Sequence, residues 1–345
     1  MAQKKKINLA LQGGGAHGAF TWGVLDRLLQ EPDLEICGMS GASAGALNGA
    51  ALKSGMISGG RTGARDNLEW LWLQVAGVSD LRMADWMAPF GLKALSKQIE
   101  LSLPYNIGSA VTQVMSPYSY GPLYKNPLRD IVEKFNYGGV QDDTHEPHFF
   151  VGATRVRNGK IRIFEGSEIG PDVLMASACL PTIFQAIEMF DEKTGRMEAF
   201  WDGGFTGNPA LFPLFAENLP DDIVIININP LERDEIPKTP QDIQNRINEI
   251  SFNSSLLREL RAIDFVQRLL EKGTVSDESM SRVRIHMIAD DVLMAKLSAA
   301  TKVMANPAVI SQLKEAGQAA AEDFLRNDID NIGKRSSVNL REMFA

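Results

Sequence analysis

Residues 34–53 read LEICGMSGASAGALNGAALK, and this stretch decides the fold. Its first part, Leu34–Met39, is mostly apolar and runs into serine and glycine, which indicates a buried β-strand. Its last part, Ala46–Lys53, contains several small residues that let a helix lie close to a sheet. Almost no loop separates the two parts. The stretch therefore predicts a strand, a sharp turn and a helix.

The preceding residues repeat this order of elements. Ile7–Leu11 is apolar, glycines follow, and residues 20–29 place apolar side chains three and four apart before Pro32. That spacing is typical of an amphipathic helix. Alternating strands and helices predict a parallel sheet with helices on its faces, which is an α/β fold. Further strands are expected at 149–154, 161–164 and 223–229. Beyond residue 240 the chain is expected to be mainly helical, with one more strand at 284–288.

The sharp turn Gly41-Ala42-Ser43-Ala44-Gly45 matches the pattern G-x-S-x-G. In that pattern the serine lies on a strained turn between strand and helix, where the glycines remove side chains that would clash and the hydroxyl is exposed. Ser43 is therefore a candidate nucleophile, and the backbone N–H of Ala44 is a candidate oxyanion donor. In the alternative interpretation, Ser43 only caps the following helix, as serine often does.

A second glycine-rich turn, residues 13–18, reads GGGAHG and joins the first strand to the first helix. Two interpretations stay open. Its glycines satisfy G-x-G-x-x-G, the dinucleotide-binding fingerprint, but that site needs an acidic residue at the end of the second strand, and Glu35 falls at its start. Alternatively, the N–H groups of this glycine loop form an oxyanion hole that faces Ser43.

A serine nucleophile requires a base within hydrogen-bond reach. Asp202-Gly203-Gly204 offers a carboxylate, although D-G-G alone is more often an ordinary turn. His286 is the competing base, because Ser43, Asp202 and His286 follow the chain order of the α/β-hydrolase triad. The residues around His286 nevertheless predict the interior of a strand.

The other histidines fit a base less well. His17 lies inside the glycine loop, and His145 and His148 lie in the polar stretch QDDTHEPH. The latter two could bind a metal, but their spacing is a weak signal for such a site.

Composition restricts the class of protein. The 35 Lys and Arg residues against 43 Asp and Glu give a net charge of −8, which disfavours binding to nucleic acid. Cys37 and Cys179 are too few for a disulfide framework and lack metal-ligand spacing. No apolar run approaches the roughly 20 residues of a membrane-spanning helix, and the N-terminal residues do not form a signal peptide. We therefore expect a soluble, cytoplasmic protein that binds no nucleic acid.

Taken together, the three motifs resemble those of the patatin-like phospholipases, in which a glycine loop, G-x-S-x-G and D-G-G follow in this order. Residues 176–181, ASACLP, and 201–209, WDGGFTGNP, are also similar to that family's surroundings of the aspartate. The resemblance covers residues 7–230. It departs at Gln12 and His17, which stand where the family loop D-G-G-G-x-R-G has an acid and an arginine.

The resemblance implies a three-layer α/β/α catalytic domain with a nucleophile elbow over residues 7–230, and a mainly helical extension over 231–345 that packs on it. It implies a Ser-Asp dyad, with Ser43 as nucleophile and Asp202 as general base. The implied reaction is two-step hydrolysis of fatty acyl esters of lipids, of phospholipase A or lysophospholipase type, without a metal or organic cofactor. The implied oxyanion donors are Gly13, Gly14, Gly15 and Ala44, and the motif glycines are Gly18, Gly41, Gly45, Gly203 and Gly204.

Residues 80–127 interrupt the regular pattern and are rich in aromatic residues and proline. They predict either a lid over the site or an irregular insertion. The aromatic residues around 86–124, with the lysines at 4–6, also suggest transient contact with a membrane surface. A catalytically silent scaffold that binds a lipid or a partner through this segment or the late helices is the remaining alternative.

Overall fold

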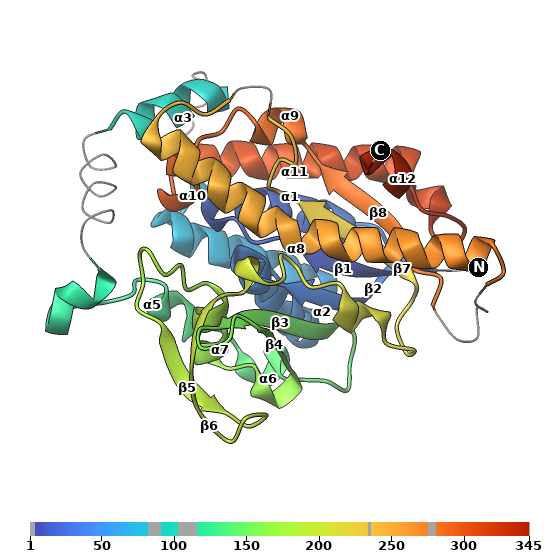
Figure 1. Cartoon of the computed structure of the whole chain (residues 1–345), viewed down its shortest axis with the longest axis horizontal. Coiled ribbons are helices and arrows are strands. Elements are labelled where there is room, and N and C mark those ends of the chain that lie inside the picture. Colours follow the sequence, from blue (N-terminus) through green and yellow to red (C-terminus); the bar gives the residue numbers. More distant parts are fainter. Residues whose placement is uncertain (1–3, 82–90, 103–115, 234–235, 275–280, 345) are drawn as a thin grey trace.

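One mixed sheet forms the centre of the described part of the computed structural model, which comprises residues 4–81, 91–102, 116–233, 236–274 and 281–344 (Figure 1). Its strands follow the order β5-β6-β3-β2-β1-β7-β8, and β4 pairs with β3. The strands are β1 (Lys5–Leu11), β2 (Leu34–Gly41), β3 (His148–Arg155), β4 (Ile161–Glu165), β5 (Ile187–Asp191), β6 (Arg196–Asp202), β7 (Asp222–Asn227) and β8 (Arg284–Ala289).

Parallel pairing extends from β3 through β2, β1 and β7 to the edge strand β8. β1 runs parallel to β2 and β7, β3 is parallel to β2, and β8 is parallel to β7. At the other edge, β4 and β6 run antiparallel to β3, and β5 runs antiparallel to β6. The predicted α/β sheet is therefore confirmed, with an antiparallel edge that the sequence pattern did not predict.

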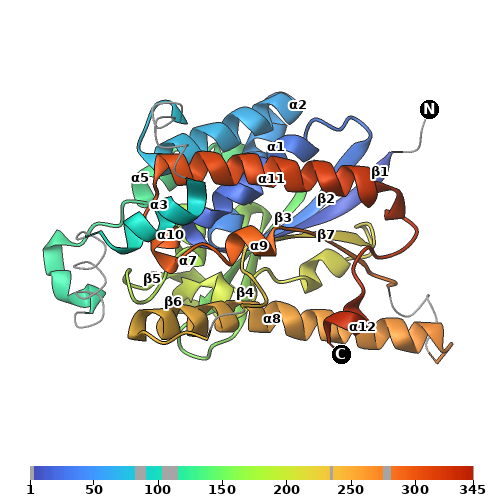
Figure 2. The ribbon, with the colours of Figure 1, turned by 90° about the horizontal axis from the view of Figure 1, so that it is seen from above.

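Helices cover both faces of the sheet. Figure 2 shows α1, α2 and α11 on one side and α8 on the other. The helices are α1 (Gly18–Leu28), α2 (Ala44–Ala76), α3 (Gly91–Glu100), α5 (Arg129–Val132), α6 (Tyr137–Val140), α7 (Pro171–Ser177), α8 (Pro240–Glu271), α9 (Asp291–Met294), α10 (Ala299–Val303), α11 (Pro307–Asn327) and α12 (Leu340–Met343). Among the described residues, none of these helices has the length and apolar character needed to cross a membrane.

The central strand β7 shows why both faces need cover. All six of its residues are buried. Val224 and Ile226 join the core that includes α1, α2 and α11, whereas Ile223 and Ile225 join the smaller core against α8. A strand that is apolar on both faces is stable only between two layers of helices.

The expected helix after the G-x-S-x-G turn begins at Ala44 and continues to Ala76 across non-helical backbone at Gly59 and Gly60. Much of the aromatic segment falls outside the described residues, including Trp86, Met87, Pro89, Phe90, Pro104, Tyr105 and Met115. The described remainder contains a 3-10 segment, η3 (Pro117–Leu123), whose Pro117 carbonyl oxygen accepts from Gln185 Nε2 and whose Tyr118 hydroxyl accepts from the Ala186 N–H. The lid and the insertion both stay predictions.

Residues beyond 230 complete the same sheet and core. β8 extends the sheet beyond β7, and α11 lies against α1. Two glycines allow this close helix contact: a Cβ atom at Gly23 would lie 1.9 Å from the Lys314 carbonyl oxygen, and one at Gly317 would lie 2.0 Å from the Phe20 carbonyl oxygen.

Replacing Gly317→Ala should destabilise the protein, because the added methyl group forces α1 and α11 apart. Overpacking of this kind costs about 1–3 kcal/mol, less the roughly 1 kcal/mol that alanine gains over glycine in a helix. Urea unfolding measures the effect. Gly138→Ala in α6 is the control, because Gly138 is also a helical glycine and a Cβ atom there would make only an ordinary contact, 3.4 Å from Asn136 Oδ1. Equal stability of the two variants would contradict the tight contact.

Candidate active site

Ser43 lies on a strained turn between β2 and α2. Its φ is 53° and its ψ −126°, and no other non-glycine residue of the described part has a positive φ. Bulky residues rarely adopt this conformation, which is typical of a nucleophile elbow. The Ser43 side chain makes no capping hydrogen bond to α2. The interpretation of Ser43 as a simple helix cap therefore does not describe this structure.

The glycines of the elbow allow close backbone contact. A Cβ atom at Gly45 would lie 2.1 Å from the Leu11 carbonyl oxygen, and one at Gly41 would lie 2.7 Å from the Gly45 backbone. Gly18 at the start of α1 is restricted in the same way by the Ala44 methyl group, 2.7 Å away. Larger residues would push the elbow off the sheet.

Ser177, at the end of α7, fixes the elbow from a second side. The Ser43 N–H donates to both the carbonyl oxygen and the Oγ of Ser177, at 3.1 and 3.0 Å. The Ser177 hydroxyl in turn donates to the Gly152 carbonyl oxygen at 2.7 Å. The motif ASACLP contained this residue, but nothing in the sequence pattern assigned it this contact.

Asp202 ends β6, and its carboxyl group is fully buried. Its backbone N–H donates to the Cys179 carbonyl oxygen at 2.8 Å, and its carbonyl oxygen accepts from Thr154 Oγ1 at 2.8 Å. Oδ1 accepts from the Gly204 N–H at 2.7 Å, whereas Oδ2 has no partner with hydrogen-bond geometry among the described residues. The carboxyl group is thus held rigidly with one oxygen free.

Burial raises the pKa of Asp202 to about 7, because removal from water disfavours the charged form. Hydrogen bonding from the Gly204 N–H and the Ser43 side chain acts in the opposite direction. The Ser43 side chain lies near enough to Asp202 to lower its pKa but does not form a hydrogen bond of ordinary geometry with Oδ2. Such imperfect geometry is common at catalytic sites without substrate. Gly203 makes the approach possible, since a Cβ atom there would lie 2.1 Å from the Gly152 carbonyl oxygen and 3.2 Å from the Ala42 methyl group.

The glycine loop packs directly on the elbow. A Cβ atom at Gly13 would lie 2.6 Å from Ser43 Cβ. No acceptor for the N–H groups of Gly14, Gly15 and Ala44 is found among the described residues. Unpaired N–H groups next to a serine are what an oxyanion hole requires.

The backbone N–H of Gly13, one of the predicted oxyanion donors, already has an acceptor in the protein. It donates to Asn208 Oδ1 at 2.7 Å, so it is already occupied. The prediction that Gly13 donates to an oxyanion is therefore wrong for this conformation. Gly13 instead fixes the position of the loop.

Comparison with known proteins identifies the family of this chain. The family model for the patatin-like phospholipases matches residues 9–215, which include the glycine loop, Ser43 and Asp202. The chain belongs to the patatin-like phospholipase family. Among solved structures, it is similar to VipD from Legionella pneumophila, with a TM-score of 0.41 and 14% identity over 96% of this chain and 67% of that one. No curated protein matches the chain.

Patatin-like phospholipases are lipid acyl hydrolases, so membership of this family explains the glycine loop without the dinucleotide-binding interpretation. Glu35, the acid considered for a ribose, lies at the start of β2 and pairs with Lys4 and Lys6. Gln12, where the family has an acid, accepts from the N–H groups of Ile228 and Asn229 at 2.8 and 3.0 Å. It thereby links the loop to the residues that follow β7.

His286 is not the partner of Asp202. Its Nε2 lies 3.0 Å from Asp222 Oδ1 and its Nδ1 lies 3.1 Å from Ser337 Oγ. Both ring nitrogens are thus occupied inside the sheet, where β8 adjoins β7. The alternative of a Ser43-Asp202-His286 triad is therefore wrong.

His17 and His145 also make contacts with residues other than Asp202. His17 is buried, its Nε2 lies 2.7 Å from Thr301 Oγ1, and burial with nearby Lys302 holds its pKa well below the ordinary value. His145 is exposed and pairs with Asp142. Among the described residues, no group of three or more His, Cys, Asp or Glu side chains could hold a metal ion.

Replacing Asp202→Asn should raise the free energy of unfolding at pH 8, by on the order of 2 kcal/mol or more. Because the pKa of Asp202 is raised, the stability that its protonated form gives the wild type is fully present below the unfolded pKa of about 3.9 and is lost as pH rises through about 7. An amide has no such loss. The advantage should shrink towards pH 5. Urea unfolding at both pH values measures it, and Asp66→Asn, at an exposed position, is the control. An Asp202→Asn variant less stable than wild type at pH 8 would contradict the raised pKa.

Proposed function

We propose that this protein hydrolyses fatty acyl esters of lipids through a Ser43–Asp202 dyad. One observation carries the proposal: a serine on a strained elbow faces a buried aspartate whose pKa is raised to about 7. Membership of a family of lipid acyl hydrolases supports the same chemistry. A substrate of phospholipase A or lysophospholipase type fits the family best.

In the first half-reaction, Ser43 Oγ attacks the ester carbonyl carbon while Asp202 Oδ2 takes the hydroxyl proton. An ordinary carboxylate is a weak base for this step, but a pKa near the operating pH makes proton transfer more favourable. Asp202 then returns the proton to the leaving alcohol as the C–O bond breaks. The products are the free alcohol and an acyl ester on Ser43.

The negative charge that develops on the carbonyl oxygen is stabilised by the N–H groups of Gly14, Gly15 and Ala44. One such donor contributes about 2.7–4 kcal/mol to transition-state stabilisation. Ala44 is also the first residue of α2, whose N-terminus carries a partial positive charge.

In the second half-reaction, Asp202 takes a proton from water, and the resulting hydroxide attacks the acyl ester. The fatty acid leaves, and the proton returns to Ser43. The site is restored with one water consumed, which balances the hydrolysis.

Contact with a lipid surface would bring such a substrate to the site. Tyr118, in η3, is 62% exposed, and its hydroxyl accepts from the Ala186 N–H at 3.1 Å. Ala186 lies seven residues after Cys179, whose carbonyl oxygen holds Asp202. We therefore include transient membrane contact in the proposal.

A fluorophosphonate should label the wild-type protein once, at Ser43, because this serine lies on a strained elbow beside a buried base and close to N–H groups for which the described residues supply no acceptor. Intact mass and peptide mapping measure labelling, and medium-chain p-nitrophenyl esters measure turnover. Ser43→Ala should lose both activities, and Asp202→Asn should lose turnover. His286→Ala, if folded, should retain turnover. A Ser43→Ala variant that still hydrolyses ester would refute the dyad.

The kcat/KM for a soluble ester should increase from pH 5 to pH 8 with a midpoint near 7, because Asp202 acts as a base only when ionised. Steady-state rates on p-nitrophenyl butyrate, in buffers of constant ionic strength, give the profile. A rate that is constant between pH 5 and pH 8 would show that no group with this pKa limits the reaction.

A further inference from the structure

The anchors of the glycine loop include residues that lie beyond the segment matched by the family model. The Gly13 peptide is held on both sides: its N–H donates to Asn208 Oδ1, and its carbonyl oxygen accepts from Asn229 Nδ2 at 2.8 Å. Asn208 Nδ2 also donates to this oxygen, at 3.3 Å. Asn229 follows β7 and lies outside residues 9–215.

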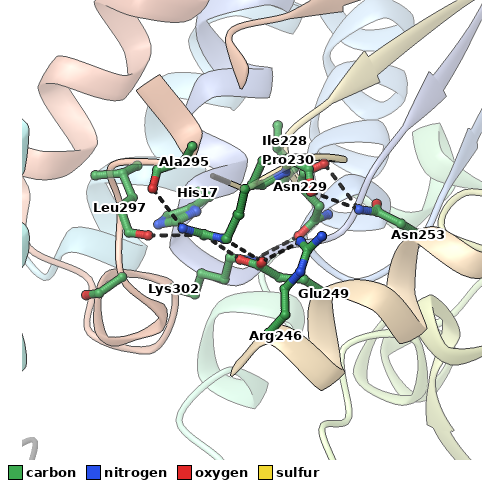
Figure 3. Close-up of polar contacts among 12 residues, drawn as sticks. His17, Ile228, Asn229, Pro230, Arg246, Glu249, Asn253, Ala295, Leu297 and Lys302 are labelled. Carbon is green, nitrogen blue, oxygen red and sulfur yellow. Dashed lines mark hydrogen bonds and ion pairs between the residues drawn. The ribbon is translucent and has the colours of Figure 1, made fainter. Parts of the chain in front are cut away.

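The orientation of Asn229 depends on Lys302 of α10. Lys302 Nζ donates to Asn229 Oδ1 at 3.0 Å (Figure 3). The amide nitrogen of Asn229 then lies towards the Gly13 carbonyl oxygen. A reversed amide would place a nitrogen against the ammonium group and an oxygen against the Gly13 carbonyl. Lys302 and Gln12, whose Oε1 accepts from Asn229 Nδ2 at 3.2 Å, thus together select the amide orientation that holds the loop.

Lys302 is itself held by an ion-pair cluster around Glu249. The Glu249 carboxylate pairs with Lys302 at 3.5 Å and with Arg246 at 3.3 Å (Figure 3). It also pairs with Arg233 at 2.7 Å. Arg233 also donates to the carbonyl oxygens of Ala295 and Leu297. Because each of these cations already has acceptors in the protein, the cluster acts as an anchor for α10.

The backbone of α10 contacts the loop as well. A Cβ atom at Gly15 would lie 2.2 Å from the Lys302 carbonyl oxygen, and the side chain of the preceding residue, Thr301, bonds to His17. Gly15 has a φ of 59°, which favours glycine. The segment from Gly13 to His17 is therefore fixed at both ends by contacts that involve α10.

We propose that Lys302 is a positioning residue for acyl transfer: through Asn229 it holds the Gly13 peptide, so that the N–H groups of Gly14 and Gly15 stay aligned with the developing oxyanion. This inference rests on the proposed function. Misplacement of a reacting group by about 1 Å can cost about 100-fold in rate. Through α10, the chain beyond residue 230 thus helps to position the proposed oxyanion donors.

The test compares Lys302→Met, Lys302→Arg and wild type on a soluble p-nitrophenyl ester. Lys302→Met keeps the length of the side chain and removes its charge and donors, so kcat should fall about 10- to 100-fold with KM unchanged. Lys302→Arg, which can still donate to Asn229, should recover most of kcat. Lys53→Met is the control, because Lys53 is a buried lysine that donates to the His145 carbonyl oxygen and not to Asn229. Its kcat should equal that of wild type.

A folded Lys302→Met variant with wild-type kcat would overturn the proposal. So would a rise in KM at constant kcat, because Lys302 would then act on substrate binding. If Lys302→Met does not fold, Asn229→Ala removes the same contact to Gly13 from the other side, and a folded Asn229→Ala variant with wild-type kcat overturns the proposal. Failure of the proposed function is distinct, since the wild type itself would then neither hydrolyse ester nor label at Ser43.

Discussion

Burial of the Asp202 carboxyl group is the constraint on which the site depends. In water this group would be a weak base, with a pKa of about 3.9. Within the sheet it is shielded from solvent, its backbone is held by Cys179 and Thr154, and its pKa rises to about 7. The same desolvation that costs stability in the ionised form supplies the base strength. Active sites of enzymes commonly contain groups whose environment lowers the stability of the protein but is needed for activity.

Close backbone contacts bring three distant segments to this carboxyl group. Ser43 is raised on a strained turn, the Asp202 loop approaches through Gly203, and the glycine loop lies against Ser43 through Gly13. The approaches of the Asp202 loop and of the glycine loop are possible only because Gly203 and Gly13 have no side chain. The strain at Ser43 is balanced by hydrogen bonds from its N–H to Ser177, so the elbow is rigid before substrate binds.

The sequence predicted the parts of the fold whose signals are local. Alternating apolar and glycine-rich stretches predicted the parallel centre of the sheet, and three short motifs predicted the segments that the structure brings together. The antiparallel edge was not predicted, although β3–β4 and β5–β6 are close in sequence, because apolar runs alone do not show in which direction strands pair. The contacts of Lys302 were not predicted because its partners Glu249 and Asn229 lie 53 and 73 residues away and leave no local pattern. His286 was kept as an alternative base for the same reason. Chain order alone could not show that β8 adjoins β7 and gives this ring to Asp222.

The protonation of Asp202 is the most direct test of this account. NMR of protein labelled with ¹³C at the aspartate carboxyl carbon, with the Asp202 signal assigned from its absence in Asp202→Asn, follows that single group through a pH titration. The account predicts a midpoint near 7 for this signal. A midpoint near the ordinary value of about 4 would contradict it, because Asp202 would then be an ordinary carboxylate and not the tuned base.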